Sequence, residues 1–431
     1  MKTRGLVYAT LASHRMRPRI QLFPLLPLVL VGLVPPAWTA TLGTPPAPTD
    51  LHVVCYVSPA GSPTNSGTPQ SPWSVAYALD HAVAPSTISF LPGTYPSIVV
   101  TRPGLQLLSP TKWAAVILGS TNMHGIEVDA GNTIIDGFQI SHTFIDGIKL
   151  NASSNTVRNC WIHHAGWGDP SAQTNSTGIY TGQGIYGGCH QRNTIEYNLI
   201  EYNGIWVGHD HGIYLCGTNH IIRGNVIRHN WTYGVQLYTG YAGESCSGIQ
   251  IYNNLVYGNG VCDNGRNCLT VWAGPPGAGV ATTNYIFNNT LIADTYYPVV
   301  CDYGFVGLTN NLILGSYDGT LIGVDGATLW CDYNLLTNAL HVGSGVLDGG
   351  HNIVTTNQPG FVNPSNGLFW LLPTSPARSV ANPQTSPPVS FFGVVQTGVT
   401  DIGAFQFNLS LSADTRVLDP SPPNPDYWAM P

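Results

Sequence analysis

Three observations on the sequence predict an all-β solenoid, in which short parallel strands wind into stacked coils. An internal repeat of variable length keeps a constant apolar core, charged residues make up only 9% of the 431 residues, and glycine and proline number 49 and 33. The low charge argues against long salt-bridged helices, and a chain rich in Gly, Asn and aromatic residues suits many short strands joined by turns. Because 43% of the residues are hydrophobic, the chain can bury a large core, unlike a disordered sequence.

The amino-terminal 40 residues have the pattern of an export signal. A basic region contains Lys2, Arg4, Arg15, Arg17 and Arg19. An apolar run from Ile20 to Val34 follows it, and the small residues Ala37 and Ala40 come after that run. The run is short for a membrane span, although an uncleaved anchor is the alternative. We therefore expect a signal peptide at 1–40, a Thr/Pro-rich linker at 41–50, and a secreted, extracytoplasmic protein without stable membrane association once the signal is removed.

The charge balance excludes nucleic acid as a partner. Without the five basic residues of the signal, ten Lys and Arg remain against 22 Asp and Glu, a formal net charge near −12. No basic stripe exists to neutralise phosphates. An anionic polymer stays open as a ligand, since six of the ten basic residues fall between Lys149 and Arg266.

The repeat is a motif of apolar residues, one polar residue that is usually Asn, and two further apolar residues. It occurs as "NTVRNCWIHH" (155–164), "NTIEYNLIEYN" (193–203), "HIIRGNVIRHN" (220–230), "IQIYNNLVYGN" (249–259) and "LTNNLILG" (308–315). The equivalent positions are Cys160, Asn198, Asn225, Asn254, Asn311 and Asn334, with Phe138 upstream in 133–141 and Thr290 in 285–294.

This repeat indicates coils of about 22 residues with loops of variable length between the strands. Alternate strand residues point to a dry core, and neighbouring coils pair in parallel about 4.8 Å apart. Asparagine at a corner tolerates left-handed backbone and can hydrogen-bond to its copies in adjacent coils. A β-sandwich or propeller with Asn-rich turns is the alternative, but it explains neither the variable length nor the constant core.

In these features the chain resembles the right-handed parallel β-helix repeat proteins of the pectate-lyase-like superfamily. The resemblance covers about residues 53–407. It begins with "YVSPAGSPTNSGTPQSPW" (56–73), passes through a capping helix at 74–83 to "ISFLPGTYPSIVV" (88–100), and closes with "DIGAFQF" (401–407), which looks like the usual final strand.

The resemblance implies a single-stranded right-handed parallel β-helix (solenoid) with an N-terminal capping helix, over residues 51–407. Pro63 and Thr64 stand where relatives often carry an acidic residue, so a calcium ion bound there is not implied for this chain. The segment 408–431, rich in Pro, Asp and Ser, is expected to be a disordered tail.

A second motif predicts which side chains face solvent. It precedes the Asn motif as "DGIKLN" (146–151), "QGIYGG" (183–188), "HGIYLC" (211–216) and "YGVQLY" (233–238). The apolar third residue should point inward, so the fourth should point outward. The fourth residues are Lys149, Tyr186, Tyr214 and Gln236; the sixth position adds Asn151, Cys216 and Tyr238, and the first adds Asp146, Gln183, His211 and Tyr233. Stacked polar and aromatic side chains suit sugar rings; the alternative is an ordinary solvated strand face.

Two cleavage chemistries fit this face. In β-elimination on a uronate-containing polymer, a base removes a proton and an acid protonates the leaving oxygen, roles open to Lys149, His211 or Tyr214. Arg223 or Lys149 would neutralise the uronate carboxylate. Glycoside hydrolysis instead needs two carboxylates, for which the candidates are Asp146, Asp210, Glu244 and Asp302.

The segment 207–215 holds the sharpest cluster and yields the candidate site. We expect catalytic roles for His211, Tyr214, Lys149, Asp210 and Arg223, with the lyase reaction slightly favoured over the hydrolase. The expected substrate-binding residues are Asp146, Tyr186, Tyr233, Gln236, Tyr238 and Trp272. A metal on His209 and His211 is an alternative, and calcium is compatible with loop Asp and Asn oxygens.

A non-catalytic carbohydrate-binding or surface protein is the alternative of a different class, since solenoids also serve as adhesins and spacers. Long insertions such as 165–183 and 273–283 argue against a plain spacer. We expect a monomer acting on a polysaccharide.

Nine cysteines in an exported chain indicate disulfides. Cys262 and Cys268 flank a short polar loop and are the first expected pair. Cys189 and Cys216 occupy equivalent positions, as a bridge or as stacked buried thiols.

Overall fold

The structure is a computed structural model that describes most of the predicted solenoid. The described residues are 53–119, 123–167, 183–205, 210–238, 245–260, 269–272, 282–293, 297–315, 322–337, 345–356, 359–391, 396 and 398–407. The signal peptide, the linker and the tail lie outside these residues and stay predictions. No helix within the described ranges is long and apolar enough to cross a membrane.

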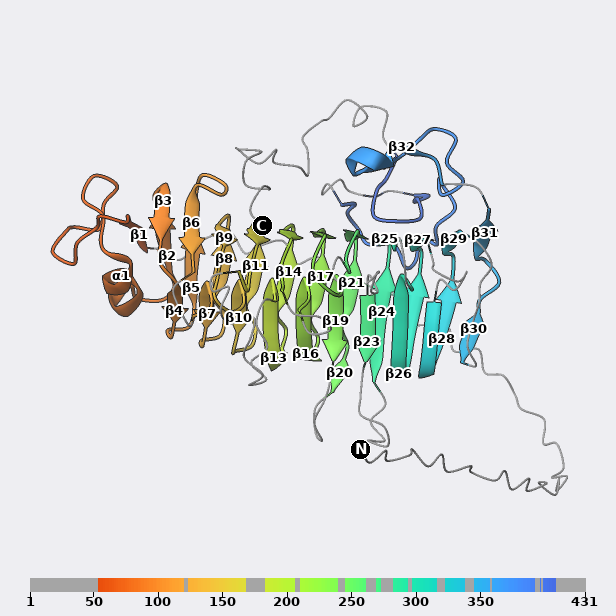
Figure 1. The fold of residues 1–431 in the computed structure, drawn as a ribbon, viewed down its shortest axis with the longest axis horizontal. Coiled ribbons are helices and arrows are strands. Elements are labelled where there is room, and N and C mark those ends of the chain that lie inside the picture. The colour runs from red at the N-terminus through yellow and green to blue at the C-terminus, as the bar shows by residue number, and fades with distance from the viewer. Residues whose placement is uncertain are drawn as a thin grey trace, which may run out of the picture. The chain divides into compact units, whose positions relative to one another are not determined.

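The described chain forms stacked coils, each built from up to three short strands (Figure 1). The first strands of the coils are β4 (Ile98–Val100), β7 (Ile126–Val128), β10 (Ile148–Leu150), β13 (Ile185–Gln191), β16 (Ile213–Thr218), β19 (Val235–Tyr238) and β23 (Leu269–Trp272). The second strands are β1 (Val53–Val57), β2 (Ser86–Phe90), β5 (Leu105–Leu108), β8 (Ile134–Asp136), β11 (Thr156–Arg158), β14 (Thr194–Glu196), β17 (Ile221–Arg223), β21 (Gln250–Tyr252), β24 (Thr283–Phe287) and β30 (Val346–Asp348).

The third strands are β3 (Gly93–Tyr95), β6 (Ala115–Leu118), β9 (Gln139–Ser141), β12 (Trp161–His163), β15 (Leu199–Glu201), β18 (Val226–Arg228), β22 (Leu255–Tyr257), β25 (Thr290–Ile292), β27 (Leu312–Leu314), β29 (Leu335–Thr337) and β31 (Ile353–Thr355). Two long strands, β26 (Val299–Thr309) and β28 (Ile322–Asp332), each cover a first and a second position, and β20 (Cys246–Ser247) lies between β19 and β21. First and second strands make one 20-stranded sheet and third strands an 11-stranded sheet, with parallel pairing throughout both. Parallel pairing between consecutive coils excludes the sandwich and propeller alternatives.

The core is a set of stacked apolar residues at alternate strand positions. Ile148, Ile185, Ile213 and Val235 lie in register on consecutive first strands and are at most 1% exposed. Because neighbours in the stack come from different coils, no coil can bury its apolar face alone.

An asparagine ladder lines one corner of the coils, between the second and third strands. Asn198, Asn225 and Asn254 are fully or almost fully buried, and each accepts the backbone N–H of the preceding ladder residue through Oδ1 at 2.9–3.0 Å. Their Nδ2 groups donate to backbone carbonyls such as that of Ile195, at 2.9 Å for Asn225. The ladder thereby satisfies buried backbone groups that a turn leaves without strand partners.

Two details of the predicted ladder are corrected. Asn289, and not Thr290, accepts the N–H of Asn254 and continues the ladder, because Thr290 is already the first residue of β25 and pairs with Leu255. The ladder asparagines do not adopt left-handed backbone either. That conformation belongs to the preceding residue, such as Tyr197 with φ 56° and Asn253 with φ 54°, while the ladder residue turns its amide along the coil axis.

Helix α1 (Val75–His81) lies within the predicted capping segment at the amino-terminal end of the described coils (Figure 1). Ser74 is its N-cap, and its Oγ accepts the Tyr77 N–H at 3.4 Å. Ala78 on this helix is fully buried and packs in the main apolar cluster with residues of the first coils, so the helix covers core that would otherwise meet water.

The carboxyl-terminal segment covers the outer face of the third strands and corrects one expectation. Residues 401–407 form no strand. Ile402, Ala404 and Phe405 are instead buried against Leu312 and its neighbours in the 11-stranded sheet. This segment also contains the antiparallel pair β32 (Phe361–Asn363) and β33 (Leu368–Leu371) and a short 3-10 helix at Pro364–Asn366. The apolar outer face of the third strands would otherwise be exposed to water. The carboxyl-terminal segment covers this face by packing against it, and not by adding a strand to the sheet.

Candidate functional site

The predicted outward column on the first strands is present in register. Lys149 pairs with Tyr186, Tyr186 with Tyr214, and Tyr214 with Gln236. All four side chains are half-buried, whereas the strand residues on either side of them are buried. Strand alternation therefore sends these four side chains to the outer surface, as the sequence predicted. We call Glu127, Lys149, Tyr186, Tyr214 and Gln236, which lie in register on β7, β10, β13, β16 and β19, the tyrosine face.

Aromatic rings gather at the centre of the tyrosine face. The Tyr186 and Tyr214 rings stack with centroids 5.5 Å apart and 18° between planes. His211 stacks on Tyr214 at 5.7 Å and on Tyr233 at 4.8 Å, both near-parallel. Tyr238 lies tilted at 6.1 Å from Tyr214. The structure thus brings five predicted site residues into one aromatic cluster, which restrains the tyrosine side chains before any ligand binds.

The amino-terminal end of the face carries an ion pair that the sequence motif could have revealed. Lys149 Nζ lies 3.3 Å from Glu127 Oε1, with both side chains about a quarter exposed. Asn151 Nδ2 donates to Glu127 Oε1 at 2.9 Å and to Asp129 Oδ1 at 2.8 Å. The segment "HGIEVD" (124–129) has the Gly-second, apolar-third pattern of the other first strands, so Glu127 and Asp129 were identifiable from the same motif.

The first-position residues do not face solvent, which corrects the prediction for Asp146, Gln183 and His211. Their exposed fractions are 3%, 2% and 1%. Asp146 accepts the N–H of Gln183 at 3.0 Å, Gln183 that of His211 at 2.7 Å, and His211 Nδ1 that of Tyr233 at 3.2 Å. These residues lie in the bend before each first strand, where the side chain turns along the coil axis toward the backbone of the next coil.

Two of the predicted carboxylates are buried behind the face. Burial raises the pKa of Asp146, and hydrogen bonding to His124 and to the Gln183 N–H opposes that rise only in part. Asp210 is fully buried, and its Oδ2 accepts the Ile205 N–H at 2.8 Å. Both carboxylates bind backbone within the fold, in positions that brace the strands carrying the tyrosine face.

Arg223 lies in a different column from Lys149 and Tyr214, on the second strands. Asp136, Arg158, Glu196, Arg223 and Tyr252 lie in register there, and we call them the ion-pair column. Arg223 Nε donates to Glu196 Oε2 at 2.7 Å and Nη1 to the Tyr252 hydroxyl at 3.0 Å. Burial opposes the charge of Arg223, but Tyr252 and Glu196 more than offset it and raise the pKa of the guanidinium above its ordinary value.

The remaining candidates fall beside the face or outside the described residues. Trp272 and Asp302 are in register on β23 and β26, one outward position further along than Gln236, although the Trp272 side chain is outside the description. His209, Glu244, Cys262 and Cys268 lie outside the described residues, as do most of the long insertions. In the part of the chain that the structure describes, no group of three or more His, Cys, Asp or Glu side chains is arranged to hold a metal ion.

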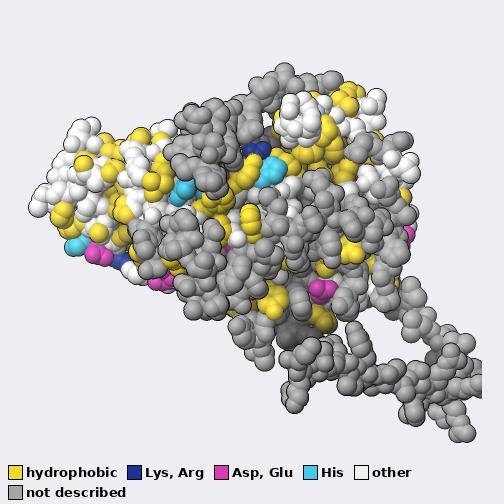
Figure 2. Space-filling model, in the orientation of Figure 1, with side chains coloured by type: hydrophobic (Ala, Val, Ile, Leu, Met, Phe, Trp, Pro, Cys, Tyr) yellow, Lys and Arg dark blue, Asp and Glu magenta, His cyan; other side chains and the backbone are white. Residues whose placement is uncertain are grey.

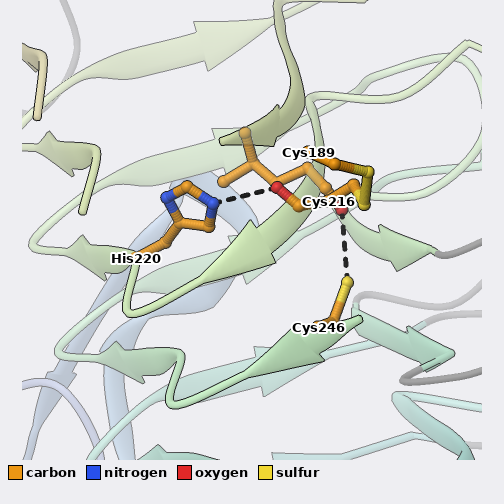
Figure 3. Close-up of a disulfide and its surroundings, with 5 residues drawn as sticks. Cys189, Cys216, His220 and Cys246 are labelled. Atoms are coloured by element: carbon orange, nitrogen blue, oxygen red, sulfur yellow. Dashed lines mark hydrogen bonds between the residues drawn. A yellow bond between two sulfur atoms is a disulfide. The ribbon is translucent and has the colours of Figure 1, made fainter. Parts of the chain in front are cut away.

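A disulfide joins two of the strands that carry the tyrosine face (Figure 3). Cys189 on β13 and Cys216 on β16 are bonded, with Cα atoms 4.4 Å apart, which confirms the bridged form of this pair. His220 Nε2 donates to the Cys216 carbonyl at 2.9 Å, and the Cys246 thiol on β20 donates to the Leu215 carbonyl at 3.8 Å. The bridge ties together the coils of Tyr186 and Tyr214.

A histidine cluster on the third strands was not found from the sequence. The rings of His142 and His164 stack with centroids 5.1 Å apart, and His163 Nδ1 is 2.7 Å from His164 Nδ1. Burial, and then repulsion from the neighbouring His142, lowers the pKa of His164 to about 4. Burial likewise lowers the pKa of His163. The signal was the equivalent placement of His142 and His164 directly after paired third strands.

Comparison with known proteins agrees with this architecture. The family model of the right-handed beta helix region matches residues 124–295. A crystal structure of pectate lyase Pel9A aligns with 82% of this chain and 96% of its own, at 15% identity and a TM-score of 0.57. A mannuronan C-5 epimerase A-module from Azotobacter vinelandii aligns with 64% of this chain and 86% of its own, at 15% identity and a TM-score of 0.46.

No curated protein matches the sequence. The family model and the pectate lyase structure bear on the fold, and they confirm the right-handed parallel β-helix that the repeat indicated. The chain therefore has a right-handed parallel β-helix fold like that of the pectate lyase structure.

Proposed function

We propose that this protein is a secreted carbohydrate-active enzyme that binds a polysaccharide along the tyrosine face and cleaves it there. The observation that carries the proposal is the in-register column of Lys149, Tyr186, Tyr214 and Gln236, with the two tyrosine rings stacked 5.5 Å apart. Coils about 4.8 Å apart present these side chains as a regular row, which suits a ligand that is itself a linear repeat. Aromatic rings can pack on the C–H faces of sugars, and amide and carboxylate groups can bind their hydroxyls.

The shared fold adds support for a polysaccharide ligand, because a pectate lyase has the same architecture. Fold alone does not define activity, so the chemistry must be argued from the residues of the face. A non-catalytic binding protein would use the same row of side chains and is distinguished only by the absence of turnover.

Cleavage by β-elimination, which the sequence favoured slightly, receives less support from the geometry. It needs a cation at the uronate carboxylate and a base at the adjacent carbon. Arg223 is engaged with Glu196 and Tyr252 on another column, and the Lys149 ammonium is already paired with Glu127. In this route Tyr214, at the centre of the face, would be the residue placed to exchange a proton with the substrate.

Hydrolysis is the second candidate chemistry and has a specific observation in its favour. Glu127 and Asp129 both accept a hydrogen bond from Asn151 Nδ2. Because both bonds end on one nitrogen, the two acceptor oxygens are at most about 6 Å apart, a limit that is compatible with the roughly 5–5.5 Å between the carboxyl groups of retaining glycosidases. The bridging amide and the Lys149 ammonium stabilise carboxylates at this end of the face.

The test is a panel of purified polysaccharides incubated with the protein and followed by two assays. New absorbance of unsaturated uronates together with new reducing ends would identify a lyase, and new reducing ends alone a hydrolase. Lys149→Met and Tyr214→Phe should lower either signal, whereas Lys112→Met, an exposed lysine beside Trp113, should not. If no polymer yields a signal and none retards the protein in an affinity gel, the proposal fails; retardation without turnover would leave a binding protein.

A further inference from the structure

The described part of the tyrosine face and its flank has more negative than positive charge. The row itself contains one cation, Lys149, and one carboxylate, Glu127, which are paired at 3.3 Å. The next outward position along the same strands adds Asp129, which is exposed. The other side chains of the row, Tyr186, Tyr214 and Gln236, are uncharged. A polymer lying here would meet a surface with an excess of carboxylates.

The other described arginines of these coils bind groups outside the tyrosine face. Arg158, Arg223 and Arg228 lie on second and third strands, and each pairs with a carboxylate at 2.7 Å or less. Arg192 lies at the corner after β13 and bonds to Ser154 and Gln191. It is six residues beyond Tyr186, about 20 Å along an extended strand. In Figure 2 charged side chains are likewise few and scattered over the described surface in that view.

From these charges we infer that the tyrosine face takes a neutral polysaccharide and rejects a polyuronate. The inference rests on the proposed polysaccharide-binding function and names its substrate class. A polyuronate would place its carboxylates beside the exposed Asp129 and beside a Lys149 that Glu127 already neutralises. Like charges brought together without compensation oppose binding. A neutral polymer has no such penalty, and its hydroxyls can bond to Gln236, Asn151 and the tyrosine hydroxyls.

Glu127 is the residue that determines this selectivity. Its carboxylate neutralises the cation of the row, so the face offers an anion no uncompensated positive charge. Specificity of this kind comes from a repulsive group as well as from attractive contacts. A substitution that removes the charge of Glu127 but keeps its shape should leave the Lys149 ammonium without a neutralising carboxylate. The same surface should then bind anionic polymers more tightly.

Affinity gel electrophoresis of the full chain at low salt tests the inference. The probes are soluble galactan, arabinan and glucomannan as neutral polymers, and polygalacturonate and alginate as anionic ones. We expect at least one neutral polymer to retard the wild-type protein and neither anionic polymer to do so. Retardation by an anionic polymer alone would overturn the inference and leave the proposed function standing. Retardation by none of the five would overturn the inference, and if no polymer of the panel is cleaved either, the proposed function fails as well.

A charge-removing variant and a matched control make the assignment of Glu127 specific. Glu127→Gln should raise affinity for polygalacturonate about fivefold at low salt, and the gain should vanish at high salt because exposed charges are screened. Adding Lys149→Met to Glu127→Gln should abolish the gain. Asp136→Asn uncovers Arg158 in the same way on the ion-pair column and should produce no gain. Equal gains from Glu127→Gln and Asp136→Asn would contradict the assignment, because net charge alone would then explain them.

Discussion

The tyrosine face and the ion-pair column are built by the same stacking rule but differ in what their side chains bind. In the ion-pair column Asp136, Arg158, Glu196 and Arg223 alternate in sign, and the series ends on the Tyr252 hydroxyl. Within the column Arg158 pairs with Asp136, and Arg223 pairs with Glu196. The tyrosine face has one such pair at its end and then aromatic and amide side chains. The ion-pair column therefore binds its own charges, whereas the tyrosine face beyond its single ion pair presents uncharged rings and one amide.

The difference also shows why charge type was a poor guide to the site. Arg223 is close in sequence to His211 and Tyr214, and an arginine suits a uronate carboxylate. Its guanidinium is instead the partner of Glu196, which is 27 residues away in the neighbouring coil. In a solenoid the important neighbours of a residue are one coil away, so proximity in sequence has little bearing on pairing.

Loss of one member of the ion-pair column should cost the most stability. Glu196→Ala leaves Arg223 without its carboxylate partner, and the Glu196 side chain is only 9% exposed. Breaking a buried pair costs about 3 kcal/mol or more, and because Arg223 is 29% exposed we expect about 2 kcal/mol. Urea unfolding measures this value. An unchanged midpoint would show that the column does not hold the coils together, and polymer affinity should stay the same in this variant.

The reverse pattern is expected on the tyrosine face. Tyr214→Ala removes the ring at the centre of the aromatic cluster and should weaken polymer binding about tenfold, while the free energy of unfolding changes by about 1 kcal/mol. Tyr285→Ala on β24 removes a half-buried tyrosine from the second strands and is the matched control. If the two alanine variants bind equally well, the distinction between the columns is lost.

Acid should destabilise the protein through the histidine cluster, which belongs to neither column. The folded-state pKa of His164 is about 4, below the 6.5 of an unfolded histidine, so the folded state binds fewer protons. Its contribution to stability is present above about pH 6.5 and is lost as the pH falls toward about 4, on the order of 1–2 kcal/mol. We expect the free energy of unfolding of His164→Gln to change less with pH between these values than that of the wild type, which urea unfolding at several pH values measures. Glu196→Ala and Tyr214→Ala should keep the wild-type dependence of the free energy of unfolding on pH. An equally weakened dependence in all three variants would contradict the assignment to His164.

The smallest effect is expected for the ion pair on the tyrosine face. Lys149→Met breaks the contact with Glu127, but both side chains are about a quarter exposed and water can replace the partner. Such a pair contributes less than about 1 kcal/mol, so the urea midpoint should shift less than in Glu196→Ala. A larger shift than in that variant would reverse the comparison between the two columns.

The repeat predicted the coils and the outward column because its spacing is a local property of the chain. The Gly-second, apolar-third motif placed Lys149, Tyr186, Tyr214 and Gln236 on one face, and their register confirms that placement. The same rule failed for Asp146, Gln183 and His211, because alternation holds within a strand and these residues lie in the bend before it. It also left the histidine cluster unfound, since His142 and His164 meet only when third strands of successive coils are superposed.

By itself the sequence determined the solenoid, since apolar alternation and a recurring corner asparagine require neighbouring coils to bury the core. Only the tertiary structure decided which side chains of adjacent coils bond: Glu127 pairs with Lys149, Glu196 pairs with Arg223, and Cys189 and Cys216 form a disulfide and not two separate thiols. The physical reason is that loops of different length separate successive coils, so contact depends on register across the stack. A loop can lengthen without changing that register, so distance along the chain does not show which charged side chains pair.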